Sequence, residues 1–289
     1  MRFEGIVRVL ERIGFLQRVE ATIGAATIDP ATWRDETWKY TSEYARGPGT
    51  EWLTDQFGAI VAGGPHGRLH MAGYDACVFI RRWLQDHGYA DRSLAEVVLT
   101  NPEWTDLKEH VGPASLFWSH LQSEPLVGVR STLGTMAAYL RSSADSPFIW
   151  CDYVCLRQAR QGDFRIPAVI ECVHLAGAVV ACIDVEMEYA ARSFCLVESF
   201  AAVVGGCRYQ CVSYATREVL ASRPVNSRTA STRWQEEKIV IDTLIAETIG
   251  FERLDAVIGA AIREGEIDDE LSETSEDSET SFEQFQMHL

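Results

Sequence analysis

The stretch 148–198 alternates apolar runs with segments of helical periodicity, and this alternation constrains the fold more than any other feature of the chain. The runs at 146–155 and 178–185 are apolar almost throughout, as buried strands are. The segments 166–175 and 189–204 instead repeat apolar residues at helical spacing. Strands that are apolar on both faces and joined by helices are typical of a parallel sheet covered on both sides.

The same alternation extends to either side of this stretch. The expected strands are 114–118, 146–155, 178–185 and 208–215. The expected helices are 126–142, 166–175, 189–204, 232–248 and 251–263. We therefore predict an α/β fold of the flavodoxin-like type, with a sheet of at least four parallel strands and helices on both faces.

The region 1–110 is predicted to be mainly helical. Apolar residues over 3–16 recur with helical spacing, and 74–87 has a similar period. Ser93 and Glu96 have the spacing of a capping box, in which each side chain binds the other residue's backbone N–H. A further short helix is therefore expected directly after Ser93.

The formal charge of −16 is concentrated at the C-terminus, where the residues from Glu264 onward include ten acidic residues and no Lys or Arg. Such a segment buries too little apolar surface to fold, so disorder is expected from about Asp268. These changes in periodicity and charge divide the chain into a mainly helical region at 1–110, an α/β domain with closing helices at 111–264 and an acidic tail at 265–289.

Composition excludes several classes of function. The acid excess is unsuited to nucleic acid, because neutralising phosphates takes clustered Lys and Arg. No run of about eighteen apolar residues is present, so no membrane span is expected. The charged N-terminus does not resemble a secretory signal. We therefore expect a cytoplasmic protein whose eight cysteines are reduced and form no disulfide.

The cysteines do not have the spacing of a metal centre. Three residues separate Cys151 from Cys155 and Cys207 from Cys211, whereas a zinc knuckle has two, and no His follows in a ligand pattern. The sequence therefore predicts no metal site. The phosphate-binding patterns GxxxxGKS/T and GxGxxG and the nucleophile turn GxSxG are also missing from the sequence.

Polar residues mark the ends of the predicted strands. Ser119 and His120 follow the first strand, Asp152 and Tyr153 belong to the end of the second, and Asp184 belongs to the end of the third. Ligands of doubly wound sheets bind outside the carboxyl ends of the strands, so these residues are candidates for a cleft. A triad of Ser119, His120 and Asp184 is disfavoured, because adjacent residues at a strand end point in different directions.

Glu198 stands in the middle of the apolar helix predicted at 189–204. Its four neighbours one helical turn away are Phe194, Cys195, Ala201 and Ala202. An ionisable group on an apolar stripe is costly unless it is paired or used. The topology could bring Ser119, Asp152 and Glu198 to one cleft. Alternatively, Glu198 is a structural partner of Arg192 or Arg208.

The order of elements from Ala114 onward resembles that of a Toll/interleukin-1 receptor (TIR) domain. The segments ASLFWSH, FIWCDY and AVVACID resemble its first three strands. YAARSFCLVES is similar to its pattern of tyrosine, small residues, serine, an aromatic, cysteine, two residues and glutamate. The resemblance covers about 110–220, but the usual Asp before the first strand is missing and the loop VCLRQARQGDFRIP differs. FIWCDYVCLRQ also resembles, more weakly, the fungal heterokaryon-incompatibility motif.

The TIR resemblance implies a function. In enzymatic TIR domains this glutamate is the catalytic residue of NAD cleavage, and the match places it at Glu198. The implied protein is an intracellular signalling or defence protein that hydrolyses NAD at the nicotinamide–ribose bond, with NAD as substrate, no cofactor and homotypic protein partners. The expected substrate contacts are Trp118, Ser119, Asp152, Tyr153 and Arg192. The alternative is a non-catalytic TIR-like scaffold for protein interactions.

Overall fold

The computed structural model describes residues 1–15, 73–123, 132–142, 146–160, 165–184, 187–213, 224–232 and 234–264. The chain divides into two compact units. The first comprises Met1–Gly112, Gln122–Ser146 and Asp152–Asp163. The second comprises Pro113–Leu121, Pro147–Cys151 and Phe164–Leu289. The polypeptide therefore passes between the units several times rather than through a single linker.

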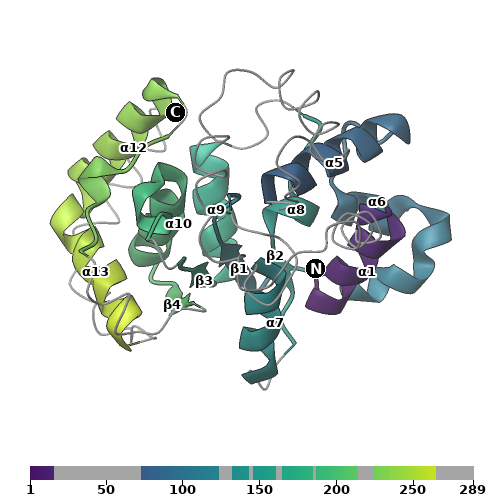
Figure 1. The fold of residues 1–289 in the computed structure, drawn as a ribbon, viewed down its shortest axis with the longest axis horizontal. Helices are drawn as coiled ribbons and strands as arrows, with labels where there is room; N and C mark the ends of the chain where they lie inside the picture. The colour runs from purple at the N-terminus through teal and green to yellow at the C-terminus, as the bar shows by residue number, and fades with distance from the viewer. Residues whose placement is uncertain are drawn as a thin grey trace, which may run out of the picture. The chain divides into compact units, whose positions relative to one another are not determined.

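The second unit is built on a four-stranded parallel sheet (Figure 1). Its strands are β1 (Leu116–Ser119), β2 (Ile149–Trp150), β3 (Ala178–Cys182) and β4 (Arg208–Val212), in the spatial order β2-β1-β3-β4. Neighbouring strands all pair in parallel, with Phe117 opposite Val179 and Ser119 opposite Ala181. The predicted α/β fold with a parallel sheet is thus confirmed, and the order corresponds to the first four strands of the doubly wound order 2-1-3-4-5.

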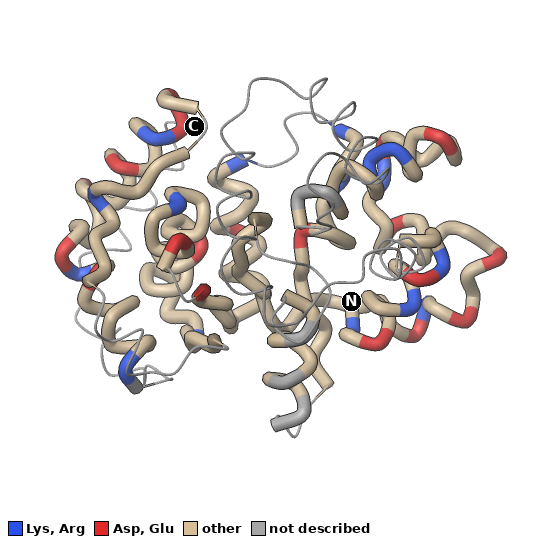
Figure 2. Tube along the Cα trace, in the orientation of Figure 1, with Lys and Arg blue, Asp and Glu red and all other residues tan. Residues whose placement is uncertain are grey.

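The sheet is almost without charge (Figure 2). Arg208, at the start of β4, is the one charged residue in the four strands. β3 is buried at every position. A central parallel strand needs apolar residues on both faces because both faces are covered, which explains the unbroken apolar run AVVAC.

Two helices pack side by side against this sheet. α9 (Ile166–Ala176) contacts β1 and β3, and α10 (Ser193–Val204) contacts β3, β4 and α9. Ile166, Val169, Ile170 and Val173 all belong to the main apolar core, which agrees with the helical spacing of apolar residues predicted over 166–175. α9 ends at Gly177, whose φ of 69° is the left-handed conformation that glycine adopts at little cost.

The two closing helices complete the second unit. α12 (Gln235–Thr248) packs on α10, and α13 (Phe251–Glu264) packs on α10 and β4. Two short 3₁₀ helices, η3 (Tyr189–Ala191) and η4 (Ser227–Thr229), contact each other. The apolar faces of α12 and α13 join the same core as α9 and α10, so the helices after the last strand stabilise the sheet rather than forming a separate layer.

The described residues of the first unit are mainly helical. They form α1 (Phe3–Arg12), α5 (Gly73–Asp86), α6 (Leu94–Thr100), η2 (Pro102–His110), α7 (Thr132–Ser142) and α8 (Asp152–Cys155). The predicted capping box is present: Glu96 N–H donates to Ser93 Oγ at 3.2 Å, and Ser93 N–H donates to Glu96 Oε2 at 2.7 Å. Arg157 donates two further hydrogen bonds to the carboxylate of Glu96. These bonds link the start of α6 to the segment after α8.

The strand predicted at 146–155 is wrong beyond Trp150. β2 ends there, and the short helix α8 begins at Asp152. An acidic residue in the first turn favours a helix start, and the Gln158 side chain donates to the Asp152 carbonyl at 2.9 Å. Tyr153 and Val154 are buried in this helix, as they would be in a strand, so apolar character alone did not separate the two possibilities.

The helix predicted at 189–204 is interrupted at Arg192, whose extended backbone separates η3 from α10. The helix predicted at 126–142 is observed from Thr132 onward, and its first residues lie outside the described residues. The acidic tail at 265–289 also lies outside them. The predicted boundaries at 110 and 264 stay predictions.

No helix of the described part of the chain is long and apolar enough to cross a membrane. All eight cysteines are free thiols. Burial raises the pKa of the Cys211 thiol to about 12. A thiol with so high a pKa stays protonated and packs as a small apolar side chain.

The conformation of Gly177 can be tested by substitution. Gly177→Ala should lower the free energy of unfolding by about 1–2 kcal/mol, because a Cβ in the left-handed region crowds the following carbonyl oxygen. Gly177→Asn should cost less, since asparagine tolerates this region. Urea unfolding measures both variants. Apart from the two adjoining residues, no atom of the described part of the chain lies within 4 Å of a Cβ built on Gly177. Equal losses for Ala and Asn would therefore contradict the backbone explanation.

The contact between Arg157 and Glu96 predicts a pH dependence. Hydrogen bonding from Arg157 is the main cause that lowers the pKa of Glu96 from 4.5 to about 2. A carboxylate with a lowered folded-state pKa stabilises the fold above its unfolded pKa, and loses this effect as the pH falls through the folded pKa. Glu96→Gln should therefore be less stable than the parent at neutral pH, with the difference closing between pH 4.5 and about 2. A difference that stays constant over this range in urea unfolding would contradict the assignment.

Candidate functional site

The strand order defines a switch point between β1 and β3. From β1 the chain passes to β2 on one side, and then to β3 on the other side of β1. Ligands of open α/β sheets bind at such a point, outside the carboxyl ends of the two strands. Ser119 is the last residue of β1, which places its side chain at this edge of the sheet.

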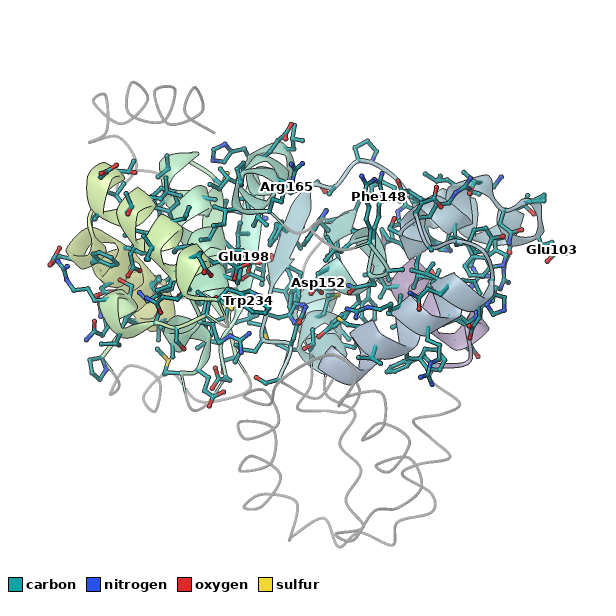
Figure 3. All side chains as sticks on the ribbon, turned by 90° about the horizontal axis from the view of Figure 1, so that it is seen from above. Glu103, Phe148, Asp152, Arg165, Glu198 and Trp234 are labelled. Carbon is teal, nitrogen blue, oxygen red and sulfur yellow. The ribbon has the colours of Figure 1, made fainter. Side chains whose placement is uncertain are left out.

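Ser119 forms a hydrogen bond with Glu198. The serine hydroxyl donates to Oε2 of the glutamate, which lies in the second turn of α10 (Figure 3). Both side chains are buried, with relative exposures of 1% for Ser119 and 8% for Glu198. The structure therefore brings together two of the three residues that the sequence expected to converge. The third, Asp152, belongs to the first unit.

The surroundings of Glu198 on α10 are apolar, as its helical neighbours predicted. Cys195, Ala201 and Ala202 are buried in the main core, and Phe194 packs against that core. A charge in surroundings of low polarity interacts more strongly with a second charge than it does in water. The carboxylate at this position is therefore suited to stabilising a developing positive charge.

Tyr189 extends the contact between Ser119 and Glu198. Its phenol forms a hydrogen bond with Ser119 Oγ. It also lies 3.3 Å from Ser199 Oγ, which in turn lies 2.9 Å from the phenol of Tyr209. Burial is the main cause that raises the pKa of both phenols well above their ordinary value, so both remain protonated hydrogen-bond donors.

Asp184 fixes the backbone of Tyr189. Its carboxylate accepts hydrogen bonds from the N–H groups of Glu188 at 3.0 Å and of Tyr189 at 2.8 Å. Asp184 is fully buried, and these bonds compensate part of the cost of burying its charge. Met187, in the same loop, has a φ of 61°. Asp184 therefore orients the loop after β3, a role different from the triad that the sequence analysis had weighed.

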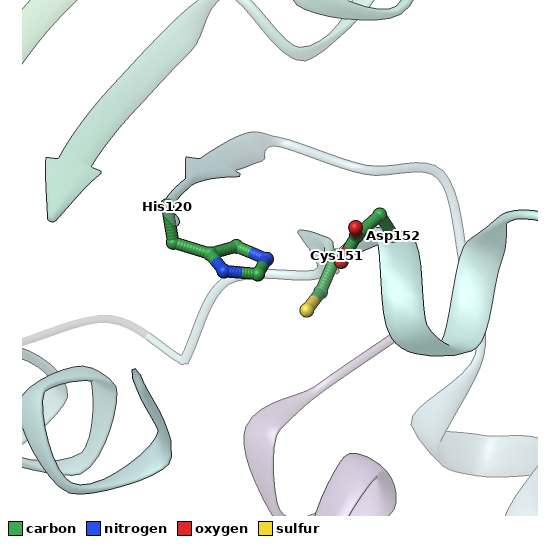
Figure 4. Close-up of side chains that lie close together, drawn as sticks. All are labelled: His120, Cys151 and Asp152. Carbon is green, nitrogen blue, oxygen red and sulfur yellow. The ribbon is translucent and has the colours of Figure 1, made fainter. Parts of the chain in front are cut away.

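His120 and Cys151 form a second pair at this edge of the sheet (Figure 4). They follow β1 and β2 directly, are 8% and 0% exposed, and have ligand atoms within 4.8 Å of each other. His120 Nδ1 lies 3.2 Å from the Leu121 carbonyl. Asp152, also drawn in Figure 4, belongs to the first unit. Two side chains are fewer than the three protein ligands of a catalytic zinc site, so the pair within the second unit does not define one.

The other expected substrate contacts of the second unit, Trp118 and Arg192, differ in their exposure to solvent. Trp118 is 1% exposed inside β1. Trp150 of the neighbouring strand β2, which is not among the expected contacts, stacks on Phe117 with ring centroids 4.5 Å apart. Both indoles contribute to packing, and Trp118 stays a prediction as a substrate contact. Arg192 is exposed at the start of α10, and its backbone bridges to Ser231. Among the sequence candidates, Arg192 is therefore accessible to an anionic group of a ligand.

Asp152 and Tyr153 are buried within the first unit. The side chain of Gln122 donates to Asp152 Oδ2. Tyr153 packs so closely on α5 that a Cβ added to Gly73 would lie 1.7 Å from its phenol oxygen. These contacts give both residues a structural role in the first unit, and they stay predictions as substrate contacts.

Tyr189 is a site residue that the sequence did not indicate, and Ser199 and Tyr209 are polar neighbours of it that the sequence did not indicate either. Ser199 follows Glu198 directly and Tyr209 lies in β4, but their hydroxyl contacts depend on the register of β4 against β3. The tyrosine of YAARSFCLVES was the available signal for Tyr189. A tyrosine near a buried carboxylate is a potential hydrogen-bond donor, in addition to being part of this pattern.

Comparison with known proteins adds no assignment to this geometry. No protein-family model, curated protein or solved structure matches the chain.

The loop after β3 yields a stability prediction. Asp184→Ala should destabilise the protein by about 2 kcal/mol or more, because it leaves the buried N–H of Tyr189 and the partly buried N–H of Glu188 without their acceptor. Asp184→Asn should cost less, because the amide oxygen can still accept one of the two bonds. Thermal and urea unfolding of both variants measure this. A smaller loss for Ala than for Asn would show that the carboxylate does not hold the loop.

Proposed function

We propose that the second unit cleaves NAD at the bond between nicotinamide and ribose, with Glu198 as the catalytic carboxylate. The observation that carries this proposal is the hydrogen bond between Ser119, at the end of a central strand, and a glutamate buried in an apolar helix at the switch point of the sheet. The TIR resemblance over 110–220 supports the choice of NAD as substrate and a role in signalling or defence.

The chemistry suits a single carboxylate. As the bond from ribose C1′ to the nicotinamide nitrogen breaks, its electron pair neutralises the pyridinium ring, and neutral nicotinamide leaves. Positive charge then develops at C1′ and the ring oxygen, as in glycoside hydrolysis. The negative charge of Glu198 stabilises this cation, and its carboxylate can accept a hydrogen bond from a ribose hydroxyl. Water that adds to C1′ and loses a proton gives ADP-ribose.

Ser119 and Arg192 have separate parts in this proposal. Ser119 holds the carboxylate through the hydrogen bond to Oε2. Arg192, exposed at the N-terminus of α10, is available to the diphosphate, because a guanidinium donates paired hydrogen bonds to phosphate oxygens. A helix N-terminus adds a favourable dipole for an anion.

A non-catalytic scaffold is the second candidate function. Trp234, directly before α12, and Ile239 and Val240 on α12 are 55%, 58% and 38% exposed. Exposed large apolar residues of this kind are suited to protein contacts. This function would depend on α12 and would not need the carboxylate of Glu198.

Glu198→Gln separates the two candidates. If the protein cleaves NAD, the variant should lose about a hundredfold to a thousandfold in turnover, because it lacks the preorganised charge that offsets the developing cation. The melting temperature should change little, since the amide oxygen can still accept the bond from Ser119. Nicotinamide release, measured by chromatography with the full chain at several concentrations, gives the rate, and the second product shows whether linear or cyclic ADP-ribose forms.

Glu171→Gln is the matched control, because Glu171 is an exposed glutamate on α9 of the same unit. It should release nicotinamide at the parent rate. A folded Glu198→Gln protein that works at the parent rate would end the catalytic role of this residue. A parent protein without activity at any concentration, including those at which copies associate, would favour the scaffold.

A further inference from the structure

The hydroxyl protons between Tyr189 and Glu198 can be assigned by counting donors. An ionised carboxylate has no proton, so Ser119 donates its one hydroxyl proton to Glu198. In its contact with Tyr189 the serine oxygen must then accept, and the phenol donates. Burial raises the pKa of Tyr189, so the phenol retains the proton that this bond needs. The two bonds therefore run in one direction, from Tyr189 through Ser119 to Glu198.

Ser199 and Tyr209 form a second pair, and Ser199 Oγ also lies 3.3 Å from the phenol of Tyr189. Ser199 Oγ lies 3.0 Å from the carbonyl of Cys195, one helical turn earlier, and donates to it. The phenol of Tyr209, 2.9 Å away, then donates to Ser199. This pair ends on a backbone carbonyl and not on a carboxylate. Tyr189 and Tyr209 are both buried phenols, but only Tyr189 contacts the serine that holds Glu198.

We propose that Tyr189 is a positioning residue for NAD cleavage, which orients the carboxylate of Glu198 through the hydroxyl of Ser119; this inference rests on the proposed function. The terminal torsion of a glutamate is broad, and a serine hydroxyl rotates freely, so neither alone fixes a direction. Because the serine oxygen accepts the bond from Tyr189, the one hydroxyl proton of Ser119 points to the carboxylate of Glu198. Hydrogen bonds that run in one direction also polarise and strengthen one another.

The position of Tyr189 is fixed by contacts other than the hydroxyl hydrogen bonds described above. Its backbone N–H donates to the buried carboxylate of Asp184, and the packing of η3 buries its side chain completely. The carbonyl of Cys195 lies 3.3 Å from the phenol and is a competing acceptor. When the phenol donates to that carbonyl, it no longer donates to Ser119. In this proposal, Glu198 is therefore held in one orientation only while Tyr189 donates to Ser119.

The test compares Tyr189→Phe with Tyr209→Phe, the same deletion of a buried phenol oxygen in the same unit. Tyr189→Phe should lower kcat by up to about a hundredfold, because small errors in placing a catalytic group have effects of this size. KM should stay within about twofold, because Tyr189 does not touch the substrate in this proposal. Tyr209→Phe should leave kcat and KM at parent values. Adding Tyr189→Phe to Ser119→Ala should cause no further loss, because Tyr189 acts through that serine.

A spectroscopic readout keeps the inference separate from the proposed function. The carboxylate stretching band of Glu198 is isolated by subtracting the infrared spectrum of the matching Glu198→Gln protein in each background. Tyr189→Phe and Ser119→Ala should both shift this band, and Tyr209→Phe should not. This result is expected even if the parent releases no nicotinamide, in which case the proposed function fails and the orientation of Glu198 by Tyr189 stands. An unchanged band in folded Tyr189→Phe, or equal shifts in the two tyrosine variants, would overturn the inference.

Discussion

The hydrogen bond from Ser119 to Glu198 joins the end of a central strand to the helix that follows β3. Tyr189, Ser199 and Asp184 are linked to it by further hydrogen bonds. A carboxylate buried among apolar side chains is tolerated only when hydrogen bonds compensate the loss of water. Ser119 meets this need because of the register of β1. A shift of β1 by one residue would turn Ser119 to the opposite face of the sheet and remove the donor from Glu198. The fold and the site therefore constrain each other.

The break at Arg192 is equally necessary for this arrangement. In one continuous helix, Tyr189 and Glu198 would be nine positions apart and about half a turn out of phase, so their side chains would lie on opposite faces. They could not both reach Ser119. The extended backbone of Arg192 lets η3 and α10 take independent directions, and Asp184 holds η3 through the Tyr189 N–H. The buried Asp184 and the helix break at Arg192 thus both help to bring Tyr189 and Glu198 to Ser119.

The sequence was sufficient for what depends on local periodicity. The positions of the four strands, α9, the capping box of Ser93 and the closing helices follow from spacing and turn chemistry. The structure confirms them, except that β2 ends at Trp150. The sequence was insufficient where a helix and a strand would bury the same residues. Tyr153 and Val154 are buried in α8 as they would be in a strand. The pairing of Ser119 with Glu198 was predictable from topology, whereas the contacts of Tyr189 and Tyr209 depend on register and on a helix break that periodicity does not reveal.

Energetics distinguish what Glu198 contributes to the fold from what it contributes to chemistry. Replacing a buried polar cluster by apolar residues of similar volume is often neutral or stabilising, so stability alone does not require a carboxylate at this position. A leucine on α10, with an apolar residue in place of Ser119, would fill the same space without a desolvation cost. The protein instead has an aspartate, a tyrosine and a serine whose hydrogen bonds hold one glutamate at the switch point of the sheet. The exposed apolar residues at α12 need none of these groups. This polar cluster supports the proposal that Glu198 takes part in catalysis, and that proposal leaves room for protein contacts through α12.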